Sequence, residues 1–328
     1  MREGIAEVAA LLRQAGSVAV CCHLNPDGDA VGTALALRLA LLRLGKRVEV
    51  FCRDKVPALV AMLPGADSVR AFESLGDAER FDLLCPVDVS DPSRLGEGWF
   101  ARMSAVCADS CQVDHHETNS RYCRVNCVDG DAPAAGLILR ELLGALGVPL
   151  DRELAECLYA AIATDTGNFS YGNVTGETFR VAAELVEAGL PLADMNRALF
   201  VVQPEAQVRL TGRAIERMRL YHGGEVAVMT LSGQDFADCG ALTEHADTVV
   251  NRGLAVRGVR MAALLREDGG RVKVSLRAVK PDTVSGIAAA FGGGGHAQAA
   301  GCILDLPLAE AAERIAQRLC AALDGGDA

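Results

Sequence analysis

The feature that most constrains the fold is an alternation, in the first half of the chain, between short apolar runs and longer amphipathic runs. The short runs have the length and β-branched content of buried strands, and the longer ones carry apolar residues at helical spacing. Strands that alternate with helices form a mostly parallel sheet covered by helices. The predicted strands are 17–22, 47–52, 81–87 and 105–113, and the predicted helices are 30–44, 133–146 and 151–163.

The second half has a different pattern. Residues 191–221 look helical and more polar, and strands are predicted beyond them at 225–231, 258–265 and 271–279, before a glycine-rich segment and a final amphipathic helix. Gly269-Gly270 predicts a hairpin turn between the last two of these strands. The 328 residues suffice for two domains. We therefore predict an α/β chain with three parts, namely an N-terminal domain, a helical connector and a smaller C-terminal α/β domain, at 1–190, 191–221 and 222–328.

Polar side chains follow the predicted elements of the first domain at the points where these end. Each such residue alone is explained by a helix cap or a turn. Four such coincidences in one domain are not, because the carboxyl ends of parallel strands meet at one edge of a sheet. The segments are His23-Leu-Asn-Pro-Asp27-Gly-Asp29, Asp88, Asp114-His115-His116 and Asp165.

Imidazole and carboxylate groups without thiolates suit Mn²⁺, with Mg²⁺, Co²⁺ or Fe²⁺ as alternatives. These groups are too numerous for one ion but suit two. Two ions about 3.5–4 Å apart can activate a shared water and clamp the attacking and leaving oxygens, which is the chemistry of phosphoester hydrolysis. The residues alone do not rank His115 against His116 as a ligand.

In order and spacing, these motifs resemble the DHH phosphoesterase superfamily, in its RecJ-like branch and closest to the bacterial bifunctional oligoribonuclease/pAp-phosphatase proteins. The resemblance implies two divalent ions, with Mn²⁺ first. It also implies that Asp114 orients an imidazole and that His116 faces the substrate phosphate as a donor or an acid. The metal ligands that it implies are His23 and Asp27 for one ion, Asp29, His115 and Asp165 for the other, and Asp88 for both.

A second motif lies in the C-terminal domain, where Gly292–Gly295 precede His296. Successive glycines let a backbone approach an anion and direct N–H groups at it. The segment resembles the GGGH motif of the substrate-binding domain in the same branch, and Ala278 departs from the serine that is frequent there. The substrate-binding residues that this resemblance implies are Ser275, Arg277, Gly293, Gly294, Gly295 and His296, together with His116.

The resemblance implies a hydrolase for short oligonucleotides, linear dinucleotides such as pApA, and 3′-phosphoadenosine 5′-phosphate. One alternative is a pyrophosphatase or exopolyphosphatase of the same superfamily. Another is a nucleotide-binding module without catalysis, against which the complete ligand set argues. The net charge of −11 argues against long duplex nucleic acid as a partner. Residues 252–280, with eight Arg or Lys and two acidic residues, indicate a local site for an anion.

The twelve cysteines are scattered and several lie in apolar runs, as expected of reduced core thiols in the cytoplasm. A zinc site at Cys107, Cys111, Cys123 and Cys127 is the alternative, although it leaves the carboxylates unexplained. No stretch approaches the roughly 20 apolar residues of a membrane helix, and 1–15 resembles an amphipathic helix and not a signal peptide. We expect a cytoplasmic protein, and the family resemblance suggests a homodimer.

Overall fold

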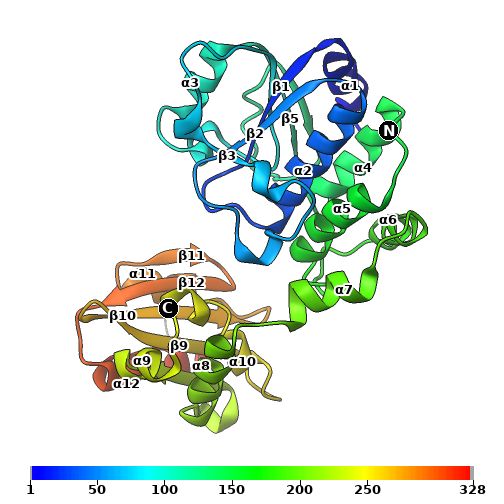
Figure 1. Ribbon diagram of the computed structural model, residues 1–328. Helices are drawn as coiled ribbons and strands as arrows, with labels where there is room; N and C mark the ends of the chain where they lie inside the picture. The colour runs from blue at the N-terminus through cyan, green and yellow to red at the C-terminus, as the bar shows by residue number, and fades with distance from the viewer. Residues whose placement is uncertain (1, 326–328) are drawn as a thin grey trace. The chain divides into compact units, whose positions relative to one another are not determined.

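The computed structural model describes residues 2–325, which divide into two compact units with the boundary between Val202 and Gln203 (Figure 1). Each unit is built on its own six-stranded sheet, so the predicted α/β class with a second, smaller α/β part is confirmed. The expected connector, 191–221, is divided between the units at residues 202 and 203. The three-part boundaries stay a prediction.

The first unit begins with an αβα segment and continues through the rest of its parallel sheet. Its helices and strands are α1 (Ile5–Gln14), β1 (Ser17–Cys21), α2 (Gly28–Arg43), β2 (Arg47–Cys52), β3 (Arg70–Ala71), β4 (Phe81–Pro86), α3 (Trp99–Val106), β5 (Cys107–Asp114), β6 (Val125–Val128), α4 (Ala135–Leu146), α5 (Arg152–Asp165), α6 (Gly176–Glu187) and α7 (Leu192–Asn196).

The first sheet has the strand order β3-β2-β1-β4-β5-β6, and every neighbouring pair is parallel. The chain therefore starts at the centre, moves outward through β2 and β3, and returns to β4 beside β1. In an open sheet of this kind, ligands bind at the carboxyl ends of the strands where the direction of progress reverses. Here that position lies between β1 and β4.

Both faces of this sheet are buried. Valines of β1 and β2, such as Val20 and Val50, pack with α1, α2, α4 and α5 on one face. Ala19, Cys21 and Phe51 point to the other face, where they meet Met103 of α3 (Figure 1). A strand buried on both sides reads as a continuous apolar run, which is why these strands were visible in the sequence.

Close packing of α2 against α5 fixes two of the polar segments relative to each other. A Cβ at Gly32 would lie 2.5 Å from the carbonyl oxygen of Cys157, and one at Gly28 would lie 2.4 Å from the hydroxyl of Thr164. Only glycine at these two positions lets the helices approach this closely. The packing brings the first turn of α2 beside the last turn of α5.

The second unit has helices on both faces of a mostly antiparallel sheet of order β11-β12-β10-β9-β8-β7, in which only β8 and β9 are parallel. One face packs on α12, and the other is covered over β8 and β9 by α8 and α10. Its elements are α8 (Glu205–Glu216), β7 (Arg219–Tyr221), β8 (Val226–Leu231), α9 (Gly233–Cys239), α10 (Asn251–Leu254), β9 (Met261–Asp268), β10 (Arg271–Ala278), α11 (Ser285–Ala290), β11 (Gly294–His296), β12 (Ala299–Leu304) and α12 (Leu308–Leu323).

Most predicted elements match these bounds within two residues, with three corrections. The strand expected at 258–265 lies three residues later, at Met261–Asp268. The strand expected from 105 begins at Cys107, because residues 99–106 form α3, whose buried Met103 packs against the sheet. Asp165 does not follow its helix but is the last residue of α5. Over residues 2–325, no helix has the length and apolar character needed to cross a membrane.

Candidate metal centre

The loop after β1 carries the first two candidate ligands. His23 is buried, with a relative exposure of 5%. Asp27 is the N-cap of α2, since its Oδ1 accepts hydrogen bonds from the backbone N–H groups of Asp29 (3.0 Å) and Ala30 (3.1 Å). The simple capping interpretation of Asp27 is therefore correct, but it uses only one carboxylate oxygen. The second oxygen stays available to a ligand.

Asp88 lies at the centre of the cluster. It lies two residues after the end of β4, and its backbone N–H donates to the carbonyl oxygen of Val113 at 2.9 Å. Its φ of 57° is a left-handed conformation, which asparagine and aspartate adopt more readily than other residues with a side chain. This conformation costs free energy, and strain of this kind concentrates at functional sites.

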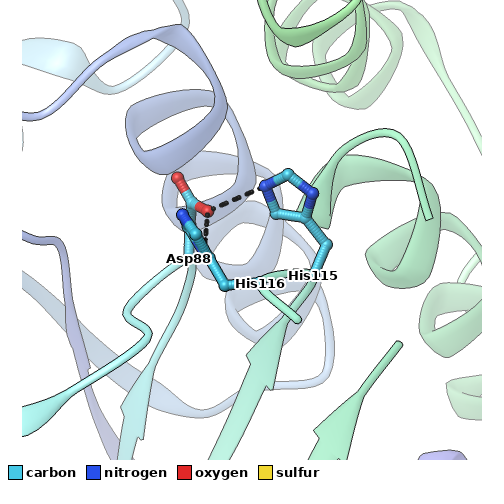
Figure 2. Close-up of side chains that lie close together, drawn as sticks. All are labelled: Asp88, His115 and His116. Carbon is cyan, nitrogen blue, oxygen red and sulfur yellow. Dashed lines mark ion pairs between the residues drawn. The ribbon is translucent and has the colours of Figure 1, made fainter. Parts of the chain in front are cut away.

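The two oxygens of Asp88 face different imidazoles. Oδ2 lies 3.5 Å from Nε2 of His23, whereas Oδ1 lies 3.3 Å from Nε2 of His115 and 3.5 Å from Nδ1 of His116 (Figure 2). Oδ1 is buried and accepts no hydrogen bond of good geometry from the described residues. A buried carboxylate oxygen without a hydrogen bond is costly unless a cation occupies the space that it faces.

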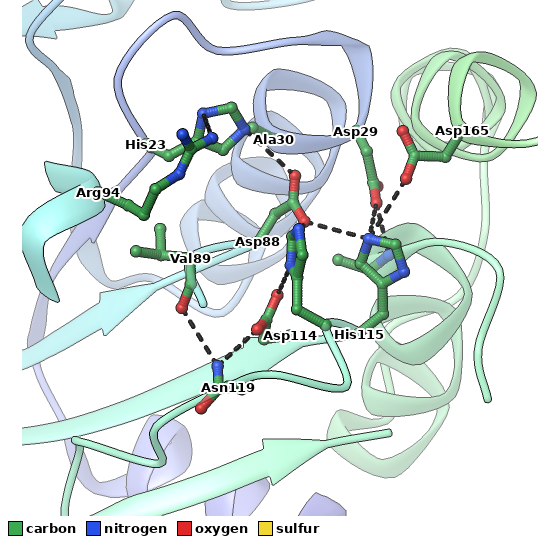
Figure 3. Close-up of polar contacts among 12 residues, drawn as sticks. His23, Asp29, Ala30, Asp88, Val89, Arg94, Asp114, His115, Asn119 and Asp165 are labelled. Atoms are coloured by element: carbon green, nitrogen blue, oxygen red, sulfur yellow. Dashed lines mark hydrogen bonds and ion pairs between the residues drawn. The ribbon is translucent and has the colours of Figure 1, made fainter. Parts of the chain in front are cut away.

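Asp29 and Asp165 approach the same cluster from the opposite side. Nε2 of His115 lies 3.6 Å from Oδ2 of Asp29 and 3.3 Å from Oδ2 of Asp165 (Figure 3). Asp29 is fully buried and accepts hydrogen bonds from the N–H groups of Ala135 (2.6 Å) and Gly136 (3.0 Å), in the first turn of α4. The positive end of that helix therefore holds the Asp29 carboxylate in place.

Hydrogen bonds set which nitrogen each imidazole presents. Nδ1 of His23 donates to the carbonyl oxygen of Leu24 at 2.7 Å, and Nδ1 of His115 donates to that of Ala132 at 3.1 Å. In both rings the tautomer so fixed leaves Nε2 as the free ligand atom, and in both rings Nε2 faces carboxylates.

His116 is held differently. Its Nδ1 donates to Oδ1 of Asp114 at 2.8 Å, and Asn119 donates to the other oxygen of Asp114 (Figure 3). The side chain of His116 is 40% exposed. The Asp114 carboxylate raises the pKa of His116 above its usual value. Asp114 is thus hydrogen-bonded to an imidazole, and its role in orienting that ring and the choice of His115 over His116 as a ligand stay predictions.

The described residues contain three groups with the spacing of a metal site, and all three lie in this cluster. Asp88 belongs to two of these groups, and it lies between the set of His23 and Asp27 and the set of Asp29, His115 and Asp165. The groups are His23, Asp27 and Asp88; Asp29, His115 and Asp165; and Asp88, His115 and His116.

The charges of the cluster also fit a cation. Burial and the neighbouring Asp88 and Asp165 raise the pKa of Asp29. Burial alone would lower the pKa of His115, but Asp165 and Asp88 raise it to about 12. In the metal-free protein, a proton on His115 therefore compensates the carboxylates, and a divalent ion would replace that proton. The donor set, and the Asp88 oxygen that lacks a hydrogen bond, fit two such ions.

The alternative zinc site has no support among residues 2–325, because none of the metal-capable groups there contains a cysteine. Burial raises the pKa of Cys107, Cys123 and Cys127 to about 12, which disfavours the thiolate form that zinc requires. Cys111 and Cys127 lie in β5 and β6 and point into the core. These thiols are core residues.

The predicted substrate-binding residues of the second unit lie on one open half of its sheet. Strand register places His296, Ala299 and Arg277 in one row across β11, β12 and β10. Ser275 lies two residues before Arg277, on the same face, opposite the surface that α12 covers. Within the described part of the chain, Arg277 has no carboxylate partner and bonds only to the carbonyl oxygen of Leu276.

Two of the predicted anion-binding glycines have another structural reason. A Cβ at Gly293 would lie 2.1 Å from the carbonyl oxygen of Gly301, and one at Gly295 would lie 2.5 Å from that of Ala299. These glycines let β11 approach β12. Only Gly294 has open space beside it, on the polar face of the sheet.

Of the eight basic residues in 252–280, two are not available to a ligand. Arg260 pairs with Glu225 and Asp282, and the buried Arg266 pairs with Asp247. The sequence could not separate these structural cations from Arg277.

Comparison with known proteins now identifies the family. The DHH family, N-terminal domain, matches residues 17–162, and the DHHA1 domain matches residues 223–324. The chain is 33% identical, over 92% of its length and 88% of the other's, to the bifunctional oligoribonuclease and PAP phosphatase NrnA of Thermus thermophilus. The chain belongs to the DHH phosphoesterase family. It is thus a phosphoester hydrolase, and the resemblance found in its sequence is confirmed.

Solved structures agree with this fold. An exopolyphosphatase-related protein from Bacteroides fragilis superposes with a TM-score of 0.88 at 25% identity, covering 98% of this chain and 97% of the other. RecJ from Thermus thermophilus in complex with Mn²⁺ gives a TM-score of 0.54 at 16% identity, covering 98% of this chain and 55% of the other.

Sequence reasoning missed several residues of this DHH-family site. Arg94, in the short helix η4 (Pro92–Leu95), reaches His23, and Asn119 supports Asp114. Thr33 donates to Asp29 at 2.9 Å. Only the position of Thr33, one helical turn after Asp29, carried a signal in the sequence. A lone arginine or asparagine in a loop carries none.

Proposed function

We propose that this chain hydrolyses short oligonucleotides, linear dinucleotides such as pApA, and 3′-phosphoadenosine 5′-phosphate, with two divalent ions, preferably Mn²⁺. The observation that carries the proposal is the position of Asp88, whose two oxygens face two separate imidazole–carboxylate groups. A shared carboxylate is the feature that distinguishes a binuclear site from two unrelated single sites. The name of the Thermus relative supports the choice of substrates.

In this proposal His23 and Asp27 would hold one ion, His115 with Asp29 and Asp165 would hold the other, and Asp88 would be a ligand of both. When bound, the ions would acidify the attacking water and stabilise negative charge on the phosphoryl oxygens. The protein contributes the orientation of these ligands through the hydrogen bonds already described.

His116 is proposed as the proton donor to the leaving oxygen. Because Asp114 holds the proton on Nδ1, the opposite nitrogen, Nε2, would be the one that donates to the substrate. The raised pKa of His116 keeps the ring protonated to a higher pH than an isolated histidine, as a general acid requires.

In the second unit, Ser275, Arg277, Gly294 and His296 are proposed to bind a phosphate of the substrate. An arginine without a carboxylate partner, on an exposed polar sheet face, suits bidentate binding of phosphate. Gly293 and Gly295 would contribute through their backbone alone. The net charge of −11 favours short substrates over long duplexes.

The test is an activity panel on the full chain loaded with Mn²⁺. We expect turnover of di- to pentanucleotides, pApA and 3′-phosphoadenosine 5′-phosphate, loss of activity with a chelator, and recovery on adding Mn²⁺. Turnover of none of these substrates by metal-loaded protein contradicts the proposal.

The Bacteroides structure, whose title names an exopolyphosphatase-related protein, favours a second candidate function. Phosphate release from polyphosphate or pyrophosphate, measured in the same panel, decides between the two. Turnover of these compounds with no activity on any nucleotide supports the second candidate. A cytoplasmic location and a homodimer stay predictions, which cell fractionation and light scattering would test.

A further inference from the structure

One cation at the rim of the metal centre has no partner and no role in the proposed function. Arg94 lies in η4, six residues after Asp88, and its side chain is exposed. Its Nη2 lies 3.5 Å from Nδ1 of His23, and Figure 3 shows the side chain extending from η4 to that ring. No other arginine or lysine of the described residues makes a contact with the candidate ligands.

The contact between Arg94 and His23 is not a hydrogen bond. Nδ1 of His23 already donates its proton to the carbonyl oxygen of Leu24 at 2.7 Å, so it has no lone pair to offer a second donor. Within residues 2–325, Arg94 has no carboxylate within ion-pair distance and no other acceptor for its side chain. All five of its N–H donors are therefore free beside the candidate metal centre.

The backbone of Arg94 is firmly held, so the free side chain is not the result of a loose loop. The N–H of Leu24 donates to the carbonyl oxygen of Arg94 at 2.7 Å. Asp91 caps η4 by accepting hydrogen bonds from Ser93, and Leu95 is fully buried. The side chain thus extends from a fixed point next to the loop that carries His23 and Asp27.

The charge of the centre indicates what Arg94 binds. If the proposed function is correct, two divalent ions meet the four carboxylates of Asp27, Asp29, Asp88 and Asp165, and the charges cancel. Asp114 is paired with His116 and adds little. A phosphomonoester carries about 1.5–2 negative charges near pH 7, whereas each phosphodiester carries about one. The monoester therefore gains more from an additional cation.

We propose that Arg94 is a phosphate-binding residue of this centre and that it favours the dianionic phosphate of a phosphomonoester over the monoanionic phosphate of a phosphodiester. This proposal rests on the proposed function. It assigns to Arg94 the selection between a terminal phosphate and an internal linkage. Its planar fork of donors fits two oxygens of one phosphate, which a lysine ammonium cannot match.

The first test measures binding without turnover. Inorganic phosphate is titrated by calorimetry into the Mn²⁺-loaded full chain at pH 8. We expect Arg94→Ala to raise the dissociation constant about 10- to 100-fold, as loss of a charge-assisted contact does, and Arg94→Lys to fall between. Arg124→Ala is the matched control, because it removes the same charge from an exposed arginine that is already paired with Asp109.

Two results of this titration overturn the proposal: a change below twofold in Arg94→Ala, or an equal change in Arg124→Ala. The titration of Mn²⁺ itself must give wild-type affinity and stoichiometry in Arg94→Ala. A loss of metal there would mean that Arg94 supports His23 and does not bind phosphate.

The second test compares kcat/KM for 3′-phosphoadenosine 5′-phosphate with kcat/KM for pApA. Arg94→Ala should lower the first at least tenfold more than the second. An equal loss on both substrates overturns the selectivity. If the wild-type chain hydrolysed neither substrate, the proposed function would fail, while the phosphate titration would still decide the role of Arg94.

Discussion

Replacement of Asp88 by asparagine tests the binuclear arrangement most directly. Asparagine keeps the size of the side chain and tolerates the left-handed φ of 57°, so the backbone after β4 should not change. What is lost is the negative charge between the two ligand groups. Alanine would remove the charge too, but it would also leave a cavity at a residue that is only 2% exposed.

The structure gives the expected magnitude. Without the Asp88 carboxylate, the group of His23 and Asp27 keeps two ligands, whereas the group of Asp29, His115 and Asp165 keeps three. Loss of a residue that only supports a ligand costs about 10- to 100-fold in metal affinity, and loss of a direct ligand should exceed that. We therefore expect the bound Mn²⁺ to fall from two ions to one.

Turnover should fall with the lost ion by at least about 10³-fold in kcat, equivalent to roughly 4 kcal/mol of transition-state stabilisation. Metal content is measured by titration calorimetry and elemental analysis, and kcat with pApA. Asp151→Asn is the control, because Asp151 caps α5 outside the centre and asparagine caps a helix equally well. Two ions bound with wild-type affinity in Asp88→Asn, or a kcat within tenfold of wild type, would refute the assignment of Asp88.

Four further predictions follow from the same structure. Arg277→Ala should raise KM for pApA about tenfold with little change in kcat. An unchanged KM would refute the proposed contact between the second unit and a substrate phosphate. Asn119→Ala should lower kcat about tenfold and alter the pH–rate profile without changing the Mn²⁺ stoichiometry, because Asn119 orients Asp114. A pH–rate profile equal to that of the wild type would contradict this role of Asn119. Gly32→Ala should reduce the free energy of unfolding by about 1–3 kcal/mol in a denaturant titration, because the Cβ of the new alanine would meet the backbone of α5. Stability equal to that of the wild type would mean that α2 and α5 can move apart without cost. Mn²⁺ binding near pH 7 should release at least one proton, because the pKa of His115 is raised to about 12 in the metal-free protein, and the affinity for Mn²⁺ should therefore increase with pH. Calorimetry in buffers of different ionisation enthalpy measures the released proton, and a binding enthalpy that does not depend on the buffer would exclude a protonated His115.

The sequence by itself determined the parallel sheet, the positions of most strands and the identity of the candidate ligands. Apolar periodicity is a local property, so the strand at 47–52 has the predicted bounds. The rule that strand ends meet at one edge then brings His23, Asp88 and His115 together without knowledge of any contact. Asp165 was identified in the same way, as a carboxylate at the end of a predicted element, although that element is a helix and not a strand.

Only the tertiary structure decided how these residues are used. The N–H groups that hold Asp29 come from Ala135 and Gly136, more than 100 residues away, and no local pattern encodes such a pairing. The same holds for the carboxylates that the rings of His115 and His116 meet, and for Arg94, whose side chain meets His23 and no carboxylate within residues 2–325. Spacing along a chain limits which groups can meet, but packing between distant segments sets their distances and their hydrogen bonds, and these determine the chemistry.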